Sequence, residues 1–339
     1  MKLPLLPLQR ALILLFAIIA VQSNVLTRQQ STLHNGEGYA VNDSVRIWYK
    51  VEGAEHADFT PILLIHGGPG ATARPFERTI GPEIAKIRPV VYMDYRGAGR
   101  SDRPKDPAKY SVAILAGDAE ALRNHLGIDR WAVFGHSNGG ATAITYALKY
   151  PDRCASLILC DPLLSPKDLE MNMIYKVAFA PAEQYVQARA IYKSDQSMEV
   201  RFNKLLDLID AKARAESQFY NRETSATLNG IQADLSREIG KGLMEPALIK
   251  GLFASGFFEF DAFKSVAKLS MPVCVLVGKF DTEISIDNAL TFALTVPDGY
   301  VATLQHSGHH PYLEETKLTA QFVNDFMNEH TQSSKTGGK

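Results

Sequence analysis

The chain has 339 residues, of which 46% are apolar, enough for one large domain or two smaller ones with a hydrophobic core. It carries 36 basic and 37 acidic residues, a formal net charge of -1. So balanced a composition predicts neither nucleic acid nor an anionic membrane surface as a partner. The three cysteines, Cys154, Cys160 and Cys274, cannot all pair, and we expect buried free thiols rather than a disulfide framework.

The N-terminal residues 1–23 have the pattern of a secretory signal peptide. Lys2 and Arg10 supply positive charge, residues 11–21 form an apolar run, and the following residues suit cleavage after Ser23. The run is shorter than the roughly 20 residues that a transmembrane helix needs. We therefore expect a secreted or periplasmic protein with no stable membrane association once the signal is removed. The alternatives are an uncleaved membrane anchor and a cytosolic chain with an unusual start.

Strand and helix patterns alternate along the chain after residue 24. Residues 44–51 alternate apolar and polar side chains, which predicts an edge strand, and residues 112–126 have the apolar spacing of a helix. The other predicted strands are apolar runs, typical of a parallel sheet: residues 61–65, 89–94, 131–134, 155–159, 273–277 and 300–304. This alternation predicts the α/β class, with a mostly parallel sheet and helices on both faces.

Residues 163–270 break this alternation, because they lack clear buried-strand patterns. The clearest helical stretches among them are residues 182–192 and 200–216. We predict an inserted helical cap here, between two parts of the α/β core at residues 24–162 and 271–330. Residues 331–339 are polar and rich in Gly, Ser and Lys, which predicts a disordered tail.

The most informative stretch is residues 131–140, WAVFGHSNGG. A predicted strand leads through Gly135, Ser137 and Gly139 into a predicted helix, which is the G-x-S-x-G pattern of a nucleophile elbow. The serine of such a turn has a strained backbone and a projecting hydroxyl, and the glycines let strand and helix approach closely. Because G-x-S-x-G also occurs by chance in ordinary turns, the rest of the chain has to supply the partners.

A serine nucleophile needs a base and an acid that orients the base, and in elbow-type hydrolases they follow in the order Ser, Asp or Glu, His. Asp281 follows the predicted strand 273–277, and His309 follows the predicted strand 300–304. Both positions lie past the carboxyl ends of strands, where open α/β sheets place their sites. We predict Ser137, Asp281 and His309 as the catalytic residues.

Each partner has rivals. The predicted acid has the alternative of an ordinary helix N-cap, and Glu283 is a weaker candidate for its role. His310 and His306 compete for the role of base. We prefer His309 because Gly308 before it permits a tight turn. The three histidines also suggest a zinc site, but no nearby Cys pair or H-E-x-x-H motif supports one, so we expect no metal and no cofactor.

The oxyanion that forms during the attack needs two backbone N–H donors. One is expected from Asn138, the residue after the nucleophile, at the start of the predicted helix. The second is expected from the HGGPG loop that follows the strand 61–65, where we choose Gly68. In isolation HGGPG is also an ordinary Gly/Pro turn.

Together these motifs make the chain resemble the α/β-hydrolase superfamily, in the form that carries a cap. The resemblance covers residues 45–160 and 270–328. It rests on HGGPG at 66–70, DYRGAGRS at 94–101, GHSNG at 135–139 and GH at 308–309. With LRNHLGIDRW at 122–131 it narrows to the prolyl iminopeptidases. Those enzymes remove N-terminal proline from peptides, and the resemblance implies the roles given above for the triad.

Two positions depart from that family, which usually has Gly before the nucleophile and Trp after it, where this chain has His136 and Asn138. G-H-S-x-G is common in esterases and lactonases that carry a cap. Three functions therefore remain open: a prolyl-iminopeptidase-like aminopeptidase, an exported carboxylesterase or lactone hydrolase, and a non-catalytic binding protein with a hydrolase fold. The expected ligand is a small molecule or a short peptide.

An aminopeptidase also has to recognise the free amine of its substrate, and a nearby carboxylate is the simplest partner. The resemblance implies acids in the cap for this role. Residues 163–270 carry 14 acidic and 14 basic residues, so their composition has no acidic bias. The candidates are Glu216, Glu223, Glu238, Glu245 and Glu259, each of which is also compatible with a solvated helix face.

Overall fold

The computed structural model describes residues 33–68 and 70–331. The predicted signal peptide and residues 332–339 of the predicted tail lie outside the described residues. No helix in the described part of the chain is long and apolar enough to cross a membrane.

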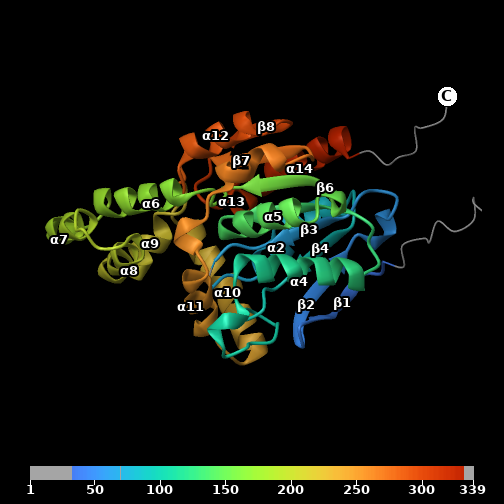
Figure 1. The fold of residues 1–339 in the computed structure, drawn as a ribbon, viewed down its shortest axis with the longest axis horizontal. Helices are drawn as coiled ribbons and strands as arrows, with labels where there is room; N and C mark the ends of the chain where they lie inside the picture. The colour runs from blue at the N-terminus through green and yellow to red at the C-terminus, as the bar shows by residue number, and fades with distance from the viewer. Residues whose placement is uncertain (1–32, 69, 332–339) are drawn as a thin grey trace, which may run out of the picture. The chain divides into compact units, whose positions relative to one another are not determined.

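One eight-stranded sheet organises the described residues. Its strands are β1 (Gly36–Asn42), β2 (Val45–Glu52), β3 (Ile62–Ile65), β4 (Val90–Met93), β5 (Trp131–His136), β6 (Cys154–Cys160), β7 (Val273–Gly278) and β8 (Gly299–Leu304). Their order across the sheet is β1-β2-β4-β3-β5-β6-β7-β8. All neighbours from β4 to β8 are parallel, whereas β1, β2 and β4 pair antiparallel. Helices lie on both faces (Figure 1), so the predicted α/β class is confirmed.

The first strands correct one prediction. Residues 44–51 were expected at the edge of the sheet, but β2 pairs on both sides, with β1 and with β4. The edge on this side of the sheet is β1, whose two glycines and terminal Asn42 weaken the alternating pattern. Most of its side chains are exposed, and its apolar signal is correspondingly poor.

The order of the central strands creates the place for a site. β3 lies between β4 and β5, so the chain crosses from β4 over β3 before it enters β5. In open α/β sheets, ligands bind outside the carboxyl ends of the strands at such a reversal. Gly68 follows β3 and Ser137 follows β5, so the predicted oxyanion loop and the predicted nucleophile both lie at this point.

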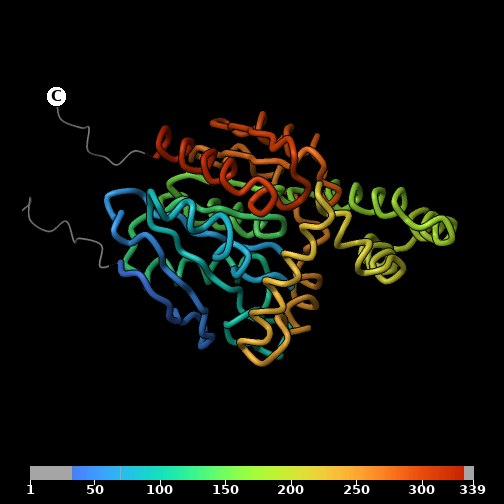
Figure 2. The backbone as a smooth tube through the Cα atoms, turned by 180° about the vertical axis from the view of Figure 1, so that it is seen from behind, coloured from blue at the N-terminus to red at the C-terminus, as the bar shows by residue number. Residues whose placement is uncertain are grey.

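Two helical layers cover the sheet. One layer contains α4 (Val112–His125), α5 (Asn138–Lys149) and α12 (Ile286–Thr295), and the other contains α2 (Arg74–Arg78), α3 (Ile80–Ala85) and α14 (Thr316–His330). Val133 packs in the first layer and its neighbour Phe134 in the second. Successive strand residues point to opposite faces, which explains why the central strands are continuous apolar runs. Figure 2 shows the second layer from behind, with α14 in red.

The chain between β6 and β7, every residue of which is described, forms helices and no strand. These helices are α6 (Pro166–Ala178), α7 (Ala182–Tyr192), α8 (Met198–Leu208), α9 (Ala211–Glu216), α10 (Thr224–Ile239), α11 (Pro246–Ala254), η4 (Phe257–Glu259) and η5 (Ala262–Lys268). Figure 1 shows α6 to α9 as one group that extends away from the sheet. α10 packs against α2, and α11 packs against the 3-10 helix η2 (Pro107–Lys109). We call residues 163–270 the cap.

The stretch 200–216 contains two helices, not one. α8 ends at Leu208, and the side chain of Asp210 begins α9 by accepting hydrogen bonds from the N–H groups of Lys212 and Ala213. Asp is a strong N-cap because its carboxylate satisfies N–H groups that have no partner within the helix. The remaining elements are η1 (Ala54–His56), η3 (Pro151–Arg153) and α13 (Pro311–Glu314).

The three cysteines, Cys154, Cys160 and Cys274, are buried free thiols. Burial raises the pKa of both Cys154 and Cys274 to about 12. Such thiols stay protonated at neutral pH and behave as small apolar side chains.

Candidate active site

Ser137 occupies a sharp turn between β5 and α5. Its φ is 55° and its ψ is −125°, a conformation that is rare for a residue with a side chain. A Cβ on Gly135 would lie 2.5 Å from the carbonyl oxygen of Gly139, and a Cβ on Gly139 would lie 2.6 Å from that of Ile65. Only glycine fits at both positions, so the two glycines let β3, β5 and α5 meet around the serine.

The structure brings Ser137, His309 and Asp281 into one hydrogen-bonded chain. Nε2 of His309 lies 2.9 Å from Oγ of Ser137, and Nδ1 of His309 lies 2.8 Å from Oδ2 of Asp281. The second carboxylate oxygen of Asp281 accepts hydrogen bonds from the backbone N–H groups of Glu283 and Ile284, at 2.6 and 3.2 Å. The carboxylate is therefore held in place from both sides, and it in turn orients the imidazole.

The electrostatics of His309 suit a base. Burial of the ring lowers its pKa, but the charge of Asp281 and the hydrogen bond to Asp281 outweigh this, so the pKa of His309 is raised above its ordinary value of 6.5. The buried carboxylate thus stabilises the imidazolium that would form when His309 takes a proton from Ser137.

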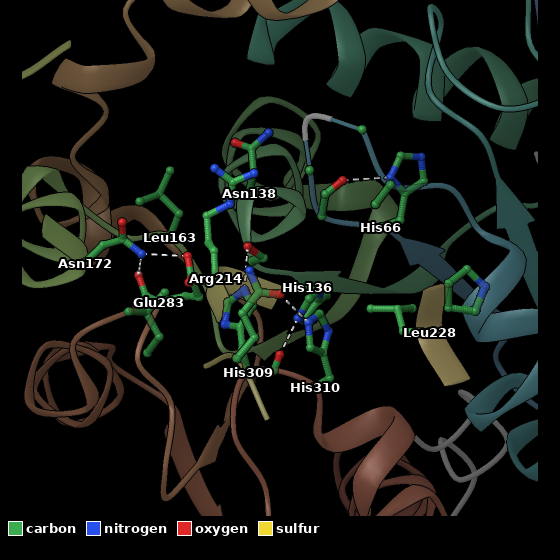
Figure 3. Close-up of a pocket in the computed structure, with 18 of the residues that line it drawn as sticks. His66, His136, Asn138, Leu163, Asn172, Arg214, Leu228, Glu283, His309 and His310 are labelled. Atoms are coloured by element: carbon green, nitrogen blue, oxygen red, sulfur yellow. Dashed lines mark hydrogen bonds between the residues drawn. The ribbon is translucent and has the colours of Figure 1, made fainter. Parts of the chain in front are cut away.

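Glu283, the rival acid, makes other contacts. Its carboxylate accepts hydrogen bonds from Nδ2 of Asn172 at 2.6 Å and from Nζ of Lys176 at 3.3 Å. Both partners come from α6 of the cap (Figure 3 shows the pairing of Glu283 and Asn172). The geometry therefore favours Asp281 over Glu283 as the partner of His309.

The rival histidines also make other contacts. His310 is buried, with Nδ1 2.9 Å from the hydroxyl of Tyr312 and Nε2 3.0 Å from Oε1 of Gln218. Burial and the neighbouring His309 and His136 hold the pKa of His310 well below its ordinary value. The side chain of His306 is 69% exposed and lies beside Glu315. Within residues 33–68 and 70–331, no group of three or more His, Cys, Asp or Glu is placed to hold a metal ion.

The two predicted oxyanion donors line the same cavity as Ser137. Asn138 is the first residue of α5, and the N–H groups of a helix's first turn have no partner within the helix. Gly68 has a φ of 120°, which only glycine adopts readily. Its neighbour Gly67 packs against the serine, since a Cβ on Gly67 would lie 2.8 Å from Cβ of Ser137. The loop therefore runs at contact distance from Ser137.

A cavity of about 690 Å³ opens over Ser137, between the core loops and the cap. Its apolar wall comes from both parts, for example from Phe76, Leu163, Phe202, Leu228, Phe253 and Phe257. Its polar wall holds several side-chain amides, among them those of Asn138, Asn172 and Gln218, and three charged side chains, Lys176, Arg214 and Glu283. A cavity of this size takes a small molecule or a short peptide.

The predicted amine-binding acids do not reach this cavity. Glu238 pairs with Arg74, Glu245 pairs with Lys105, and Glu216 lies 3.7 Å from Lys212. Glu223 and Glu259 are exposed. Among the described residues, the carboxylate that lines the cavity is Glu283, which lies in the core loop after β7.

Sequence reasoning missed Asn172, Lys176 and Arg214 at the cavity wall. A signal was present on α6, where Asn172 and Lys176 are four residues apart, next to the apolar Leu169 and Met173. Polar side chains at this spacing share a helix face. Both are buried, and a buried polar pair on an apolar face indicates a site or an ion pair.

Residues 60–316 match the family model described as the alpha/beta hydrolase fold. With the sheet, the elbow and the cavity at the strand ends, the chain belongs to the α/β-hydrolase fold family and is a hydrolase. The resemblance to prolyl iminopeptidases is also confirmed. The probable proline iminopeptidase of Leptolyngbya boryana is 37% identical over 279 residues, which are 78% of this chain and 84% of that protein.

Solved structures share the fold. The proline iminopeptidase-related protein of Thermus thermophilus has a TM-score of 0.72 at 20% identity, covering 88% of this chain and 99% of its own. Est816, described as an N-acyl homoserine lactone degrading enzyme, has a TM-score of 0.63 at 20% identity, covering 85% of this chain and 100% of its own. At such identities both structures show the fold and leave the substrate open.

Proposed function

We propose that the chain is a serine hydrolase that works through an acyl-enzyme, with Ser137 as nucleophile, His309 as base and Asp281 as the acid that orients it. The observation that carries this proposal is the hydrogen-bonded chain from Asp281 through His309 to Ser137, at 2.8 and 2.9 Å. Ser137, at the end of this hydrogen-bonded chain, has the strained backbone of a nucleophile elbow.

The reaction follows from this geometry. Oγ of Ser137 attacks the substrate carbonyl while Nε2 of His309 takes its proton, and the N–H groups of Asn138 and Gly68 stabilise the oxyanion. The intermediate collapses, and His309 returns the proton to the leaving amine or alcohol. A water molecule, deprotonated by the same histidine, then attacks the acyl-enzyme, and His309 returns this proton to Oγ of Ser137 as the acid leaves.

For the substrate we propose an N-terminal prolyl peptide, as in the relatives called proline iminopeptidases. Such a substrate needs a carboxylate for its free amine, and Glu283 is the carboxylate at the cavity wall. The amine would join Asn172 and Lys176 as donors to Glu283.

One observation favours a second candidate, a carboxylesterase or lactone hydrolase. The described cavity wall carries two cations, Lys176 and Arg214, against one carboxylate, Glu283, and Lys176 already neutralises that carboxylate. An ester or lactone substrate requires no amine site, so this charge balance suits it.

Rates on proline p-nitroanilide, its N-acetyl derivative and p-nitrophenyl butyrate separate the candidates. If the peptidase proposal is right, acetylation lowers kcat/KM by roughly 30- to 900-fold, because the substrate loses its charged amine and the hydrogen bond that this amine donates to Glu283. Glu283→Gln should remove this discrimination, whereas Glu223→Gln, a change in an exposed cap acid, should keep it. Rapid ester turnover with none of the anilide would reject the peptidase and leave the esterase. No turnover of any of the three would point to a non-catalytic binding protein.

A further inference from the structure

Arg214 is a cation at the cavity wall that has no carboxylate partner within salt-bridge distance among the described residues. Its guanidinium donates one hydrogen bond, from Nη1 to the carbonyl oxygen of Leu206 at 2.8 Å. Lys176, the other cation of this wall, is paired with Glu283. The charged side chains of the cavity therefore leave one positive charge uncompensated, and it belongs to Arg214.

A buried amide without partners lines the same cavity. Asn138 is only 3% exposed. Neither Oδ1 nor Nδ2 of its side chain has a hydrogen-bond partner in the described structure. A buried amide left unpaired destabilises the folded protein, and each such group calls for an explanation. In the view of Figure 3, the side chain of Arg214 points toward Asn138. A bound group with hydrogen-bond acceptors would pair with the guanidinium of Arg214 and with Nδ2 of Asn138.

We propose that the cavity binds a carboxylate of its substrate, with Arg214 as the counter-charge and Nδ2 of Asn138 as a second donor. This inference rests on the proposed function, since it describes the substrate that Ser137 attacks. A guanidinium is the natural partner because its planar N–H groups match the two oxygens of a carboxylate. The carboxylate has two possible sources: the C-terminus of a dipeptide, which leaves with the amine, or an acid group on the acyl part of an ester.

Binding to the full-length Ser137→Ala protein, measured by NMR titration, tests the proposal without any need for turnover. One matched pair is Pro-Gly and its C-terminal amide, which places the carboxylate on the leaving side. The other is monomethyl succinate and methyl butyrate, which places it on the acyl side. Within at least one pair, the carboxylate compound should bind about 10- to 100-fold more tightly, the range for a charge-assisted hydrogen bond.

Substitutions then assign the effect to one residue. Arg214→Gln should reduce the preference to within about threefold, and Arg214→Lys should keep part of it, because the charge remains but the two-pronged contact is lost. The matched control is Arg237→Gln, which removes the same charge from an exposed cap residue paired with Asp234 and should keep the preference.

Equal binding within both pairs would overturn the proposal, as would a preference that survives Arg214→Gln. If Arg214→Gln does not fold, as judged by thermal unfolding, Arg214→Lys decides, and an undiminished preference there counts against it. Turnover of Pro-Gly and monomethyl succinate by the wild-type chain tests the proposed function separately. Absence of turnover with a carboxylate preference in binding would reject the hydrolase mechanism and keep the subsite.

Discussion

The backbone carbonyl of Gln218, in the cap, accepts a hydrogen bond from the N–H of His309, with the two atoms 2.7 Å apart. The same residue's side chain meets His310, and the hydroxyl of Thr282, next to Asp281, donates to the carbonyl of Ser217. The segment that follows α9 therefore holds the loops of both partners of Ser137. The cap therefore contributes to the position of the proposed base as well as to the cavity over Ser137.

Gly308→Ala should cost activity through this contact. A Cβ at Gly308 would collide with the backbone carbonyl oxygen of Gln218, so the His309 loop has to move. A displacement of about 1 Å at a reacting group costs on the order of 100-fold in rate, and we expect a loss of that size in kcat.

The matched control for that experiment is Gly230→Ala. Gly230 lies within α10, and a Cβ there would meet nothing within 4 Å. Alanine is the better helix former, so this variant should keep full activity with equal or higher thermal stability. Wild-type kcat in Gly308→Ala would show that the loop tolerates the shift.

Ser137→Ala and His309→Ala should each lower kcat by at least about a thousandfold, because the members of a triad act as a unit. His310→Ala should retain activity within about tenfold, since His310 bonds to Tyr312 and Gln218 rather than to Ser137. Rates on whichever substrate the wild type hydrolyses provide the measurement, with circular dichroism as the check of folding. An inactive, folded His310→Ala beside an active His309→Ala would reassign the base.

The fall of kcat/KM at low pH should reflect the protonation of His309. Its pKa is raised because the charge and hydrogen bond of Asp281 exceed the effect of burial. The base must be neutral, so kcat/KM should fall as the pH drops through a value above 6.5. In Asp281→Asn the charge of Asp281 is gone and that of Glu283 remains, so the acidic limb should move to lower pH while kcat falls on the order of 10⁴-fold. A limb that stays in place would mean that another group titrates.

The buried ion pair between Arg96 and Asp118 should matter far more for the stability of the fold than an exposed ion pair does. Arg96 and Asp118 have fully buried side chains, joined by two hydrogen bonds of 2.6 and 2.7 Å. Asp118→Ala leaves a buried guanidinium unpaired, and we expect the free energy of unfolding to drop by about 3–5 kcal/mol. Asp129→Ala, which breaks the exposed pair with Arg153, should change it far less. Urea unfolding of both variants gives the comparison, and equal losses would refute this ranking.

Export remains a proposal that rests on residues 1–23. N-terminal sequencing of protein from its native host should find a chain that starts near Asn24, in a secreted or periplasmic fraction. A chain that starts at Met1 in a membrane fraction would favour the anchor instead.

The sequence alone determined the α/β class, the elbow and the order of Ser137, Asp281 and His309, because these are local patterns. Apolar runs, glycines at a turn, and a polar residue after a strand each act within a few positions of the chain. It also placed these residues at one edge of the sheet, since the carboxyl ends of parallel strands lie on the same side.

Only the tertiary structure decided between neighbours that share the same local pattern. His309 and His310 are adjacent, and Asp281 and Glu283 are two residues apart, so periodicity treats them alike. Which of them joins the hydrogen-bonded chain to Ser137 depends on contacts with segments far away in sequence: Gln218 contacts both histidines, and α6 pairs with Glu283. The same holds for the cavity wall, because Arg214 and Lys176 line the cavity only as a result of how the cap packs on the core. Long-range packing of this kind cannot be predicted from the periodicity of the sequence.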